Sequence, residues 1–370
     1  MKITCDREQF LPAFQAAATV APNRSPKAIL QNVKLDVTDA GGILMATDQE
    51  VGIRLSVAGL EIAQGGSVVL PVGRFGSILR ESSDDKLRIE TTDRGTIVKG
   101  DRSEFKLNAE NPDEFPTVAT FNEEKYHEIP ARLLKELIRR TIFATDVESS
   151  RYALGGVLLE FHEDKIIAVG TDGRRLAKME GPAKSVGGHL SGDGTTIVPT
   201  RSMALLERIL TDGDAEVQIA ARPNDILIQT PRATIYSRLV EGRYPRWRDV
   251  LPNRTDAAKV DFNVGPFFSA LRQAAIVTSD DSRGIDFTFG NGSLELVALT
   301  AEVGQARVEL PVPYEGAEVR VTLDNRFVAE FCKVLDPEKI FTFEFGDGDG
   351  PVLLSTADGY NYVVMPLSRD

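Results

Sequence analysis

Cysteine, histidine and tryptophan are scarce in this chain. Its 370 residues include two cysteines, three histidines and one tryptophan. Cys5 and Cys332 lie far apart in sequence, which excludes a disulfide framework and is typical of the reducing cytoplasm. The histidines, His127, His162 and His189, lie near no cysteine pair, so we expect no zinc or other metal site.

Long apolar segments and nucleotide-binding motifs are also missing. No window reaches about 18 uninterrupted apolar residues, so we expect no membrane span. The N-terminal MKITCDREQF has no apolar region of a secretory signal. The glycine-rich segment 187–194 lacks the Gly-Lys-Ser/Thr ending of a phosphate-binding loop, and no cofactor is expected. Together these absences predict a soluble, cytoplasmic protein.

One pattern of elements recurs three times, about 125 residues apart. Thr47-Asp48 returns as Thr171-Asp172 after 124 residues. Three Xaa-Pro pairs end the units, at spacings of 129 and 121 residues: Phe115-Pro116, Tyr244-Pro245 and Met365-Pro366. The period is too long for a solenoid, whose units have about 20–50 residues. The sequence therefore predicts one domain copied three times, with boundaries at 1–122, 127–250 and 253–370.

Each copy is expected to contain two helices and about eight strands. Apolar residues recur at helical spacing in the windows 6–19, 73–82, 130–144, 200–211, 265–278 and 324–335. In the first window Pro12 would interrupt a helix, so regular structure is expected only from about that residue onward. Two helices cannot cover both faces of so many strands, which favours an α+β fold with helices on one face.

Charge is distributed unevenly over these elements. The six helix windows together carry +5, so the rest of the chain carries −17 of the total charge of −12. A basic helix face on an acidic protein would attract phosphate there and repel it elsewhere.

Two other functions remain open on the residues alone. Asp48, Glu50 and Asp172 could serve a metal-dependent hydrolase or nuclease, although an Asp repeated at a strand end is more typical of a turn. A monomeric protein-interaction scaffold is the second alternative. Mutation of Asp172 to Asn tests the first alternative, and the mass in solution tests the second.

Several segments resemble the bacterial sliding clamp family, the beta subunits of DNA polymerase III. They are Ala46–Glu50, Ala168–Leu176, Leu239–Pro245 and the ending Val363-Val364-Met365-Pro366, and the similarity extends from one end of the chain to the other. The resemblance implies a non-catalytic processivity factor for DNA replication. Two chains would join head to tail into a homodimeric ring whose helices line the hole around duplex DNA.

The resemblance also implies which residues contact DNA and close the ring. DNA contacts are expected without sequence specificity at Arg24, Arg74, Arg139, Arg140, Arg201 and Arg272. Edge strands are expected to pair between the two chains, with Phe105 and Leu107 on one side and Ile276 and Val277 on the other.

A partner-binding cleft is the third implication. It would capture short peptides of the replicative polymerase alpha subunit, the clamp-loader delta subunit, and repair and translesion polymerases. By position it comprises Leu154, Thr171, Gly173, Arg174, Arg175, Leu176, Pro245, Val250, Val363, Met365, Pro366 and Leu367.

The chain departs from the family pattern around this cleft. Ala153 stands where a tyrosine is common, Arg174 where histidine is common, and Asp249 where arginine is common. The tail 368–370 extends past the usual end, so we expect a difference in peptide preference.

Overall fold

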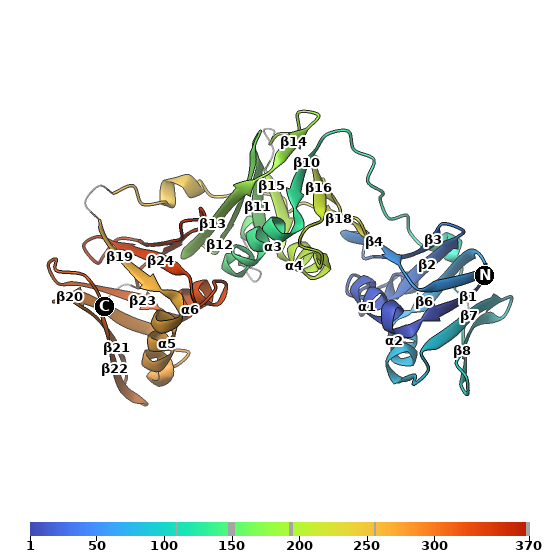
Figure 1. The fold of residues 1–370 in the computed structure, drawn as a ribbon, viewed down its shortest axis with the longest axis horizontal. Helices are drawn as coiled ribbons and strands as arrows, with labels where there is room; N and C mark the ends of the chain where they lie inside the picture. The colour runs from blue at the N-terminus through green and yellow to red at the C-terminus, as the bar shows by residue number, and fades with distance from the viewer. Residues whose placement is uncertain (109, 147–151, 192–194, 255–256, 368–370) are drawn as a thin grey trace. The chain divides into compact units, whose positions relative to one another are not determined.

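The computed structural model describes residues 1–108, 110–146, 152–191, 195–254 and 257–367. In these ranges the chain forms six α-helices and 26 strands, and the same order of two helices and eight strands occurs three times, with one further strand in each of the first two copies (Figure 1). The helices are α1 (Arg7–Ala18), α2 (Val72–Glu81), α3 (Ala131–Arg139), α4 (Thr200–Ile209), α5 (Val264–Ala274) and α6 (Asn325–Lys333). The predicted α+β class with a tripled domain is confirmed.

The first copy places its strands in two antiparallel sheets. One has the order β5-β1-β7-β8-β9, and the other strands follow as β6-β2-β3-β4. Their bounds are β1 (Lys2–Asp6), β2 (Asn32–Thr38), β3 (Gly41–Thr47), β4 (Val51–Val57), β5 (Leu60–Gln64), β6 (Gly66–Pro71), β7 (Lys86–Thr92), β8 (Gly95–Lys99) and β9 (Glu104–Leu107).

The second copy repeats this arrangement. Its strands follow as β14-β10-β16-β17-β18 and as β15-β11-β12-β13. Their bounds are β10 (Tyr126–Pro130), β11 (Gly156–Phe161), β12 (Lys165–Thr171), β13 (Arg175–Pro182), β14 (Lys184–Val186), β15 (Thr196–Pro199), β16 (Glu216–Ala221), β17 (Asp225–Gln229) and β18 (Ala233–Arg238).

The third copy has the orders β19-β24-β25-β26 and β23-β20-β21-β22. Its strands are β19 (Ala258–Asn263), β20 (Gly284–Gly290), β21 (Ser293–Thr300), β22 (Gly304–Pro311), β23 (Val319–Asp324), β24 (Ile340–Phe345), β25 (Val352–Ser355) and β26 (Asn361–Val364).

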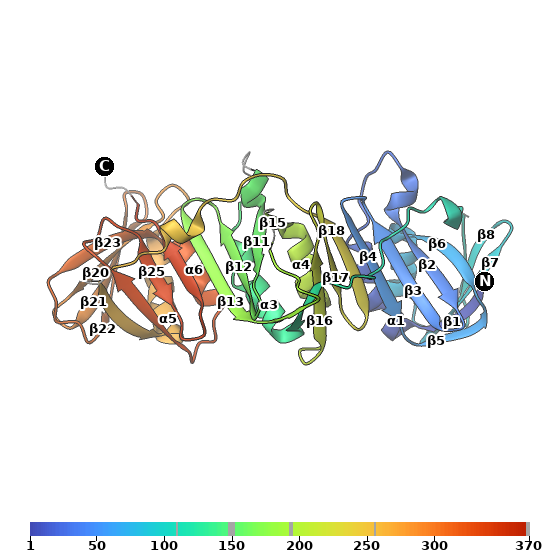
Figure 2. The same ribbon diagram turned by 90° about the horizontal axis from the view of Figure 1, so that it is seen from above.

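Neighbouring copies are joined by antiparallel pairing of their outer strands. β18 of the second copy pairs with β4 of the first, with Ile235 opposite Ile53 (Figure 2). β26 of the third copy pairs with β13 of the second, with Val363 opposite Leu176. Because β18 and β26 hold the same place in their copies, as do β4 and β13, the two junctions are built alike.

Two compact units follow from the contacts within the chain, and the second copy contributes one sheet to each. The first unit contains Met1–Lys135, Ala183–Gly194 and Arg201–Leu239, and the second contains Glu136–Pro182, Thr195–Thr200 and Val240–Asp370.

Aromatic side chains fill the core beneath the paired helices. In the first copy Phe10 and Phe14 of α1 contact Phe75 of α2, with ring centroids 6.0 and 5.0 Å away. The expectation that α1 becomes regular only near Pro12 is wrong, because the helix begins at Arg7 with Asp6 as its N-cap. Pro12 removes one N–H, and burial of Phe10 and Phe14 outweighs that loss.

Both cysteines are free and buried in this core. Burial raises the pKa of each thiol to about 12, so Cys5 and Cys332 are protonated and unreactive near neutral pH. Among the described residues, no helix is long and apolar enough to cross a membrane.

Candidate functional site

The repeated Thr-Asp pair forms the same tight turn in the first two copies. The Asp48 carboxylate accepts the backbone N–H groups of Glu50 and Val51, at 3.0 and 2.7 Å. The Asp172 carboxylate accepts those of Arg174 and Arg175, at 2.9 and 3.0 Å. Both aspartates therefore stabilise turns, as the alternative to a catalytic role predicted. Across the described part of the chain, no group of three or more His, Cys, Asp or Glu side chains could hold a metal ion.

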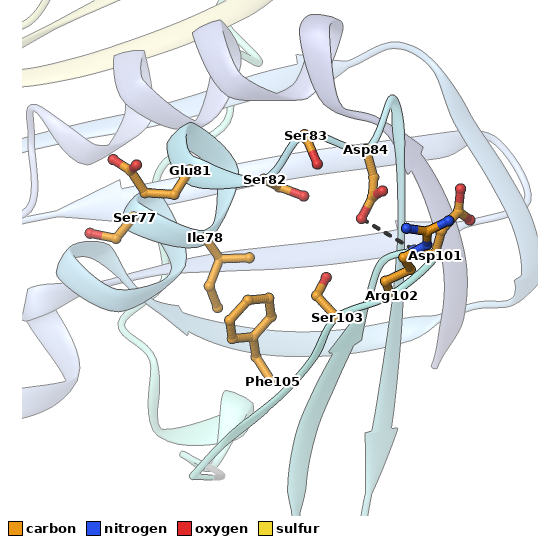
Figure 3. Close-up of a pocket in the computed structure, with 10 residues that line it drawn as sticks. All are labelled: Ser77, Ile78, Glu81, Ser82, Ser83, Asp84, Asp101, Arg102, Ser103 and Phe105. Atoms are coloured by element: carbon orange, nitrogen blue, oxygen red, sulfur yellow. Dashed lines mark hydrogen bonds between the residues drawn. The ribbon is translucent and has the colours of Figure 1, made fainter.

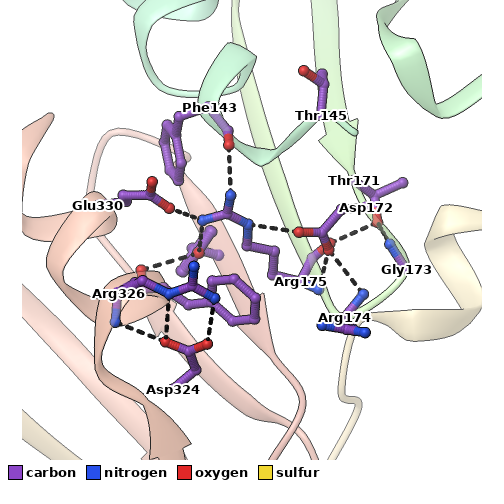
Figure 4. A network of polar contacts seen from close by, with 12 residues as sticks. Phe143, Thr145, Thr171, Asp172, Gly173, Arg174, Arg175, Asp324, Arg326 and Glu330 are labelled. Atoms are coloured by element: carbon purple, nitrogen blue, oxygen red, sulfur yellow. Dashed lines mark hydrogen bonds and ion pairs between the residues drawn. The ribbon is translucent and has the colours of Figure 1, made fainter. Parts of the chain in front are cut away.

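Arg175 stands at the centre of a buried polar network beside the second turn (Figure 4). Its guanidinium donates to Asp172 at 3.0 Å and to the Phe143 carbonyl at 2.7 Å, and it pairs with Glu330. It also stacks on the Phe327 ring, 4.4 Å from the centroid. The side chain is only 8% exposed, so these contacts compensate the loss of hydration of its charge.

The predicted cleft residues Leu176 and Val363 meet in one apolar cluster. They face each other across the β13–β26 pair and pack with Tyr244 and Trp247 in a common buried group. The Tyr244 hydroxyl donates to the Val169 carbonyl at 2.9 Å, which fixes the segment after β18 against β12.

The predicted cleft residues separate into a buried and a more accessible set. The buried set is Leu154, Thr171, Arg175, Leu176 and Val363. The exposed or half-buried set is Gly173, Arg174, Pro245, Val250, Met365, Pro366 and Leu367. Val250, Met365 and Leu367 keep 38–42% of their surface exposed although they are large and apolar. Such side chains are available to a partner.

Backbone contacts hold the C-terminal strand end in place. The Met365 N–H donates to the Arg174 carbonyl and the Leu367 N–H to the Thr322 carbonyl, both at 2.9 Å. Ala153 packs against the cluster. Asp249 pairs with Arg246 at 3.2 Å. The tail 368–370 lies outside the described residues.

Five of the six arginines predicted to contact DNA are exposed. In the described structure, Arg24 and Arg74 make no side-chain hydrogen bond or ion pair. Arg139 donates to the Val334 carbonyl at 2.7 Å, Arg201 pairs with Asp48, and Arg272 lies over the Phe268 ring. These side chains keep their charges at the surface.

The expectation for Arg140 is wrong, because this residue is only 3% exposed. Its guanidinium pairs with Glu136 at 2.7 Å and Asp358 at 2.9 Å, and lies over the Tyr360 ring. Helical periodicity detects the neighbours of a residue within its own helix but not those from the third copy, which bury this side chain.

Two further surface arginines were not predicted from the sequence. Arg208 at the end of α4 and Arg232 before β18 line a cavity of about 500 Å³ beside Pro12 and Ala16 of α1. Neither guanidinium has a hydrogen bond or ion pair among the described residues. A basic residue in the last turn of a helix was the available signal for Arg208.

Phe105 and Leu107 lie on β9, an edge strand of its sheet, as predicted. Phe105 is 38% exposed and borders a cavity of about 700 Å³ that Ile78 of α2 also lines (Figure 3). An exposed edge with an apolar hollow beside it is suited to receive another chain.

Ile276 and Val277 do not lie on an edge strand, which corrects the expectation. They belong to a 3-10 turn, Ala275–Val277, that directly follows α5 and contacts β22. β22 is the edge strand of that sheet. Ile276 is 75% exposed, so an apolar side chain protrudes beside the free edge.

A two-helix domain copied three times and joined edge to edge defines a DNA-clamp fold. The sequence patterns of the DNA polymerase III beta subunit match all three copies. The N-terminal domain pattern matches residues 1–119, the central domain 128–246 and the C-terminal domain 248–368. The chain belongs to the family of the DNA polymerase III beta subunit, the beta sliding clamps.

Relatives and solved structures agree with this assignment. The beta sliding clamp of Pseudomonas putida is 31% identical over 99% of this chain and 100% of its own length. That of Halalkalibacterium halodurans is 26% identical, over 97% and 96%. A structure of the Pseudomonas aeruginosa sliding clamp bound to griselimycin is 30% identical, with a TM-score of 0.92 and full coverage of both chains.

Family membership fixes the broad biochemical class. The family is a processivity clamp, an accessory subunit of DNA polymerase III without catalysis of its own. Its partners are DNA and a polymerase.

Proposed function

We propose that two copies of this chain close head to tail into a ring around duplex DNA and tether the replicative polymerase in the cytoplasm. One observation carries the proposal. The chain contains two edge-to-edge junctions with the same strand pairing, β18 with β4 and β26 with β13, and leaves unpaired the strands that would form a third. β9 is equivalent to β18 and β26, and β22 is equivalent to β4 and β13.

The register of the closing junction follows from this equivalence. Phe105 of β9 and Ile235 of β18 hold the same position in their copies. Each pairs with a residue at the same place in the strand before it, β8 in the first copy and β17 in the second. Ile235 lies opposite Ile53. Gln305 is the β22 residue equivalent to Ile53. In each copy this residue pairs with the one that directly precedes the threonine at the end of the neighbouring strand. We therefore expect Phe105 opposite Gln305 of the second copy.

The apolar side chains beside the two edges support the same closure. Ile276, exposed next to β22, has the character needed to fill the cavity bordered by Phe105 and Ile78. A head-to-tail contact that closes after two copies produces a ring rather than a filament.

The exposed arginines supply the DNA-facing charge in this proposal. Arg24, Arg74, Arg139, Arg201 and Arg272 provide non-specific phosphate contacts, whereas Arg140 maintains the fold. Arg139 and Arg201 already have a carbonyl and a carboxylate partner within the chain, which favours weak contacts with DNA and sliding along it.

The surface around Met365, Leu367 and Val250 is assigned to partner peptides. Leu176 and Val363 form its floor. Anchoring one Leu or Phe there contributes roughly 1.5–3 kcal/mol, which suits exchangeable binding of the polymerase alpha subunit, the clamp-loader delta subunit, and repair and translesion polymerases in turn.

Ring closure is tested by the mass in solution and by retention on DNA. We expect twice the chain mass of 40.4 kDa by light scattering. Protein loaded on nicked circular DNA is expected to survive moderate salt and to dissociate once the circle is linearised. Equal retention on linear and circular DNA would contradict a topological link.

Substitution at the edge locates the interface. Phe105→Asp introduces a charge into the apolar contact and is expected to give a folded monomer. Ile340→Asp is the matched control, since Ile340 is 59% exposed on β24, away from both free edges. A Phe105→Asp variant that remains dimeric would place the interface elsewhere.

A further inference from the structure

One position of the repeated first helix carries an arginine in the second copy and an alanine in the first. Arg7 begins α1 and Ala131 begins α3, and both donate their backbone N–H to the residue just before the next paired strand, β7 or β16. Counted from these helix starts, Ala16 and Arg140 hold the same position. The two internal junctions can therefore be compared side chain by side chain at this place.

At the second junction the side chain of Arg140 fills the place. Its guanidinium pairs with Glu136 at 2.7 Å and with Asp358 at 2.9 Å. It also lies 5.3 Å from the centroid of the Tyr360 ring, and the residue is only 3% exposed. A cation between two carboxylates thus closes this part of the second junction.

At the first junction small or apolar residues hold each of these positions. β18 and β26 run in the same register against β4 and β13. Ala16 therefore stands for the arginine, Pro12 and Pro231 for its two carboxylates, and Ala233 for the aromatic ring. Since the large side chains are missing, a cavity of about 500 Å³ remains, and Pro12 and Ala16 line it.

The charge around this cavity is the reverse of that at the second junction. Arg208 at the end of α4 and Arg232 in the turn before β18 both line it. Neither guanidinium makes a hydrogen bond or an ion pair within the described part of the chain. Among the described residues that line the cavity, none is acidic. The second junction surrounds a cation with carboxylates, whereas the first surrounds a cavity with cations, which is suited to an anion.

The rest of the lining indicates what the anion is attached to. Two guanidinium groups match the geometry of phosphate, which accepts paired hydrogen bonds from each. The volume lies in the range of about 300–1,000 Å³ typical of sites for small organic ligands. Leu55 of β4 and Ile209 of α4 offer apolar surface, and Gln15 and Thr211 offer polar groups. A ligand with phosphate at one end and a flat ring at the other combines these features.

We propose that the cavity between α1 and α4 binds a small nucleotide, with its phosphate groups held by Arg208 and Arg232. The base lies against the apolar wall that Ala16 and Leu55 provide. This site shares no residue with the proposed DNA-contacting, peptide-binding or ring-closing surfaces, so nucleotide binding is a separate property of the first junction.

Calorimetry on the full-length protein tests the site with three probes in magnesium-free buffer. ADP carries both parts of the expected ligand, adenosine lacks the phosphates, and pyrophosphate lacks the base. We expect saturable binding of ADP at one site per chain, with a Kd below about 1 mM. Adenosine and pyrophosphate should each bind at least about ten-fold more weakly, because each loses one set of contacts.

Substitutions assign the binding to this cavity. Arg208→Gln and Arg232→Gln should each weaken ADP binding about ten-fold. Ala16→Leu keeps both arginines but fills the cavity, and it should weaken ADP binding at least as much. Arg94→Gln, an exposed arginine in the turn between β7 and β8, is the matched control and should bind ADP as the unmodified protein does. Thermal unfolding and light scattering check that each variant keeps its fold and its mass in solution.

Three outcomes would overturn the inference. The first is the absence of saturable ADP binding to the unmodified protein. The second is unchanged ADP binding by folded Ala16→Leu, which would place the phosphates outside the cavity. The third is displacement of ADP by a duplex oligonucleotide at equal phosphate concentration, which would assign the two arginines to DNA. Because the mass in solution reports ring closure separately, none of these results bears on the proposed ring.

Discussion

The two internal junctions of the chain share one backbone design and differ in their chemistry. Both begin after a Thr-Asp turn, and both pair an outer strand of one copy with an outer strand of the next. At the first junction Asp48 pairs with Arg201, a side chain that is 55% exposed. At the second, Asp172 pairs with Arg175, which is buried.

The two junctions therefore share a fold, but different kinds of interaction stabilise them. The apolar side chains of Ile53 and Ile235 face each other at the first junction. The second contains a buried cation whose partners come from the second and third copies. Loss of one partner of a buried ion pair is costly, whereas an exposed pair contributes about 0–1 kcal/mol.

The largest expected effect is at Arg175. Substitution by Ala leaves Asp172 and Glu330 without their cation and removes the group that stacks on Phe327. We expect the free energy of unfolding of the second unit to fall by about 3–5 kcal/mol, measured by urea denaturation and by hydrogen exchange in β13 and β26. Arg201→Ala, its counterpart at the first junction, should cost about 1 kcal/mol or less. Equal losses in both variants would refute the contrast.

A smaller effect is expected at the third residue of the two turns. Gly173 has a φ of 88° and Gln49, at the equivalent position, a φ of 80°. A residue with a Cβ is strained there by about 1–2 kcal/mol. Gly173→Ala should therefore destabilise by about 1 kcal/mol through this strain alone, since no atom outside the adjoining residues lies within 4 Å of the added Cβ. Gln49→Ala should be close to neutral, because that turn already contains the strain. Thermal unfolding of the two variants makes the comparison.

The smallest expected effect is the response to acid of the segment that leads to the third copy. Glu160 of β11 accepts hydrogen bonds from Trp247 and Arg248, at 2.9 and 3.0 Å. In the first copy the equivalent residue, Asp36, pairs with Lys34 at 3.4 Å on its own strand. Burial alone would raise the pKa of Glu160, but the bonds from Arg248 and Trp247 hold it below its ordinary value of 4.5.

Because the pKa of Glu160 is lower in the folded state, its ionised carboxylate stabilises the fold at pH values above the ordinary pKa. This stabilisation is lost as the pH falls through the lowered pKa. Trp247 is the sole tryptophan, so its fluorescence should change below about pH 4.5. Glu160→Gln should remove that transition and cost about 0.5–1 kcal/mol near neutral pH. An unchanged titration in the variant would assign the signal to another group.

The sequence predicted the features that repeat within an element. The turn aspartates, the apolar stripes of α3 to α6 and the tripled order were readable because each depends on local spacing. The Leu176–Val363 contact required the family resemblance, since it joins residues almost 190 positions apart.

The errors arose where packing between copies decides the outcome. Arg140 belongs to the surface by helical periodicity, but Asp358 and Tyr360 of the third copy enclose it. Ile276 and Val277 continue the apolar pattern of α5, which concealed the change to a 3-10 turn. β22 has the alternation of a half-buried strand, but no local pattern shows that it lies at the edge of its sheet, because that depends on how distant strands pair.

The free edges β9 and β22 have a consequence for how a ring of this protein would open. The junctions inside the chain are tethered, so each strand meets its partner at an effective concentration that linkers of this kind hold near the millimolar range. The third junction has no tether and obeys mass action between separate molecules. The same strand pairing is thus permanent at two places and reversible at one. Opening of such a ring would begin at this third junction, because it alone dissociates on dilution.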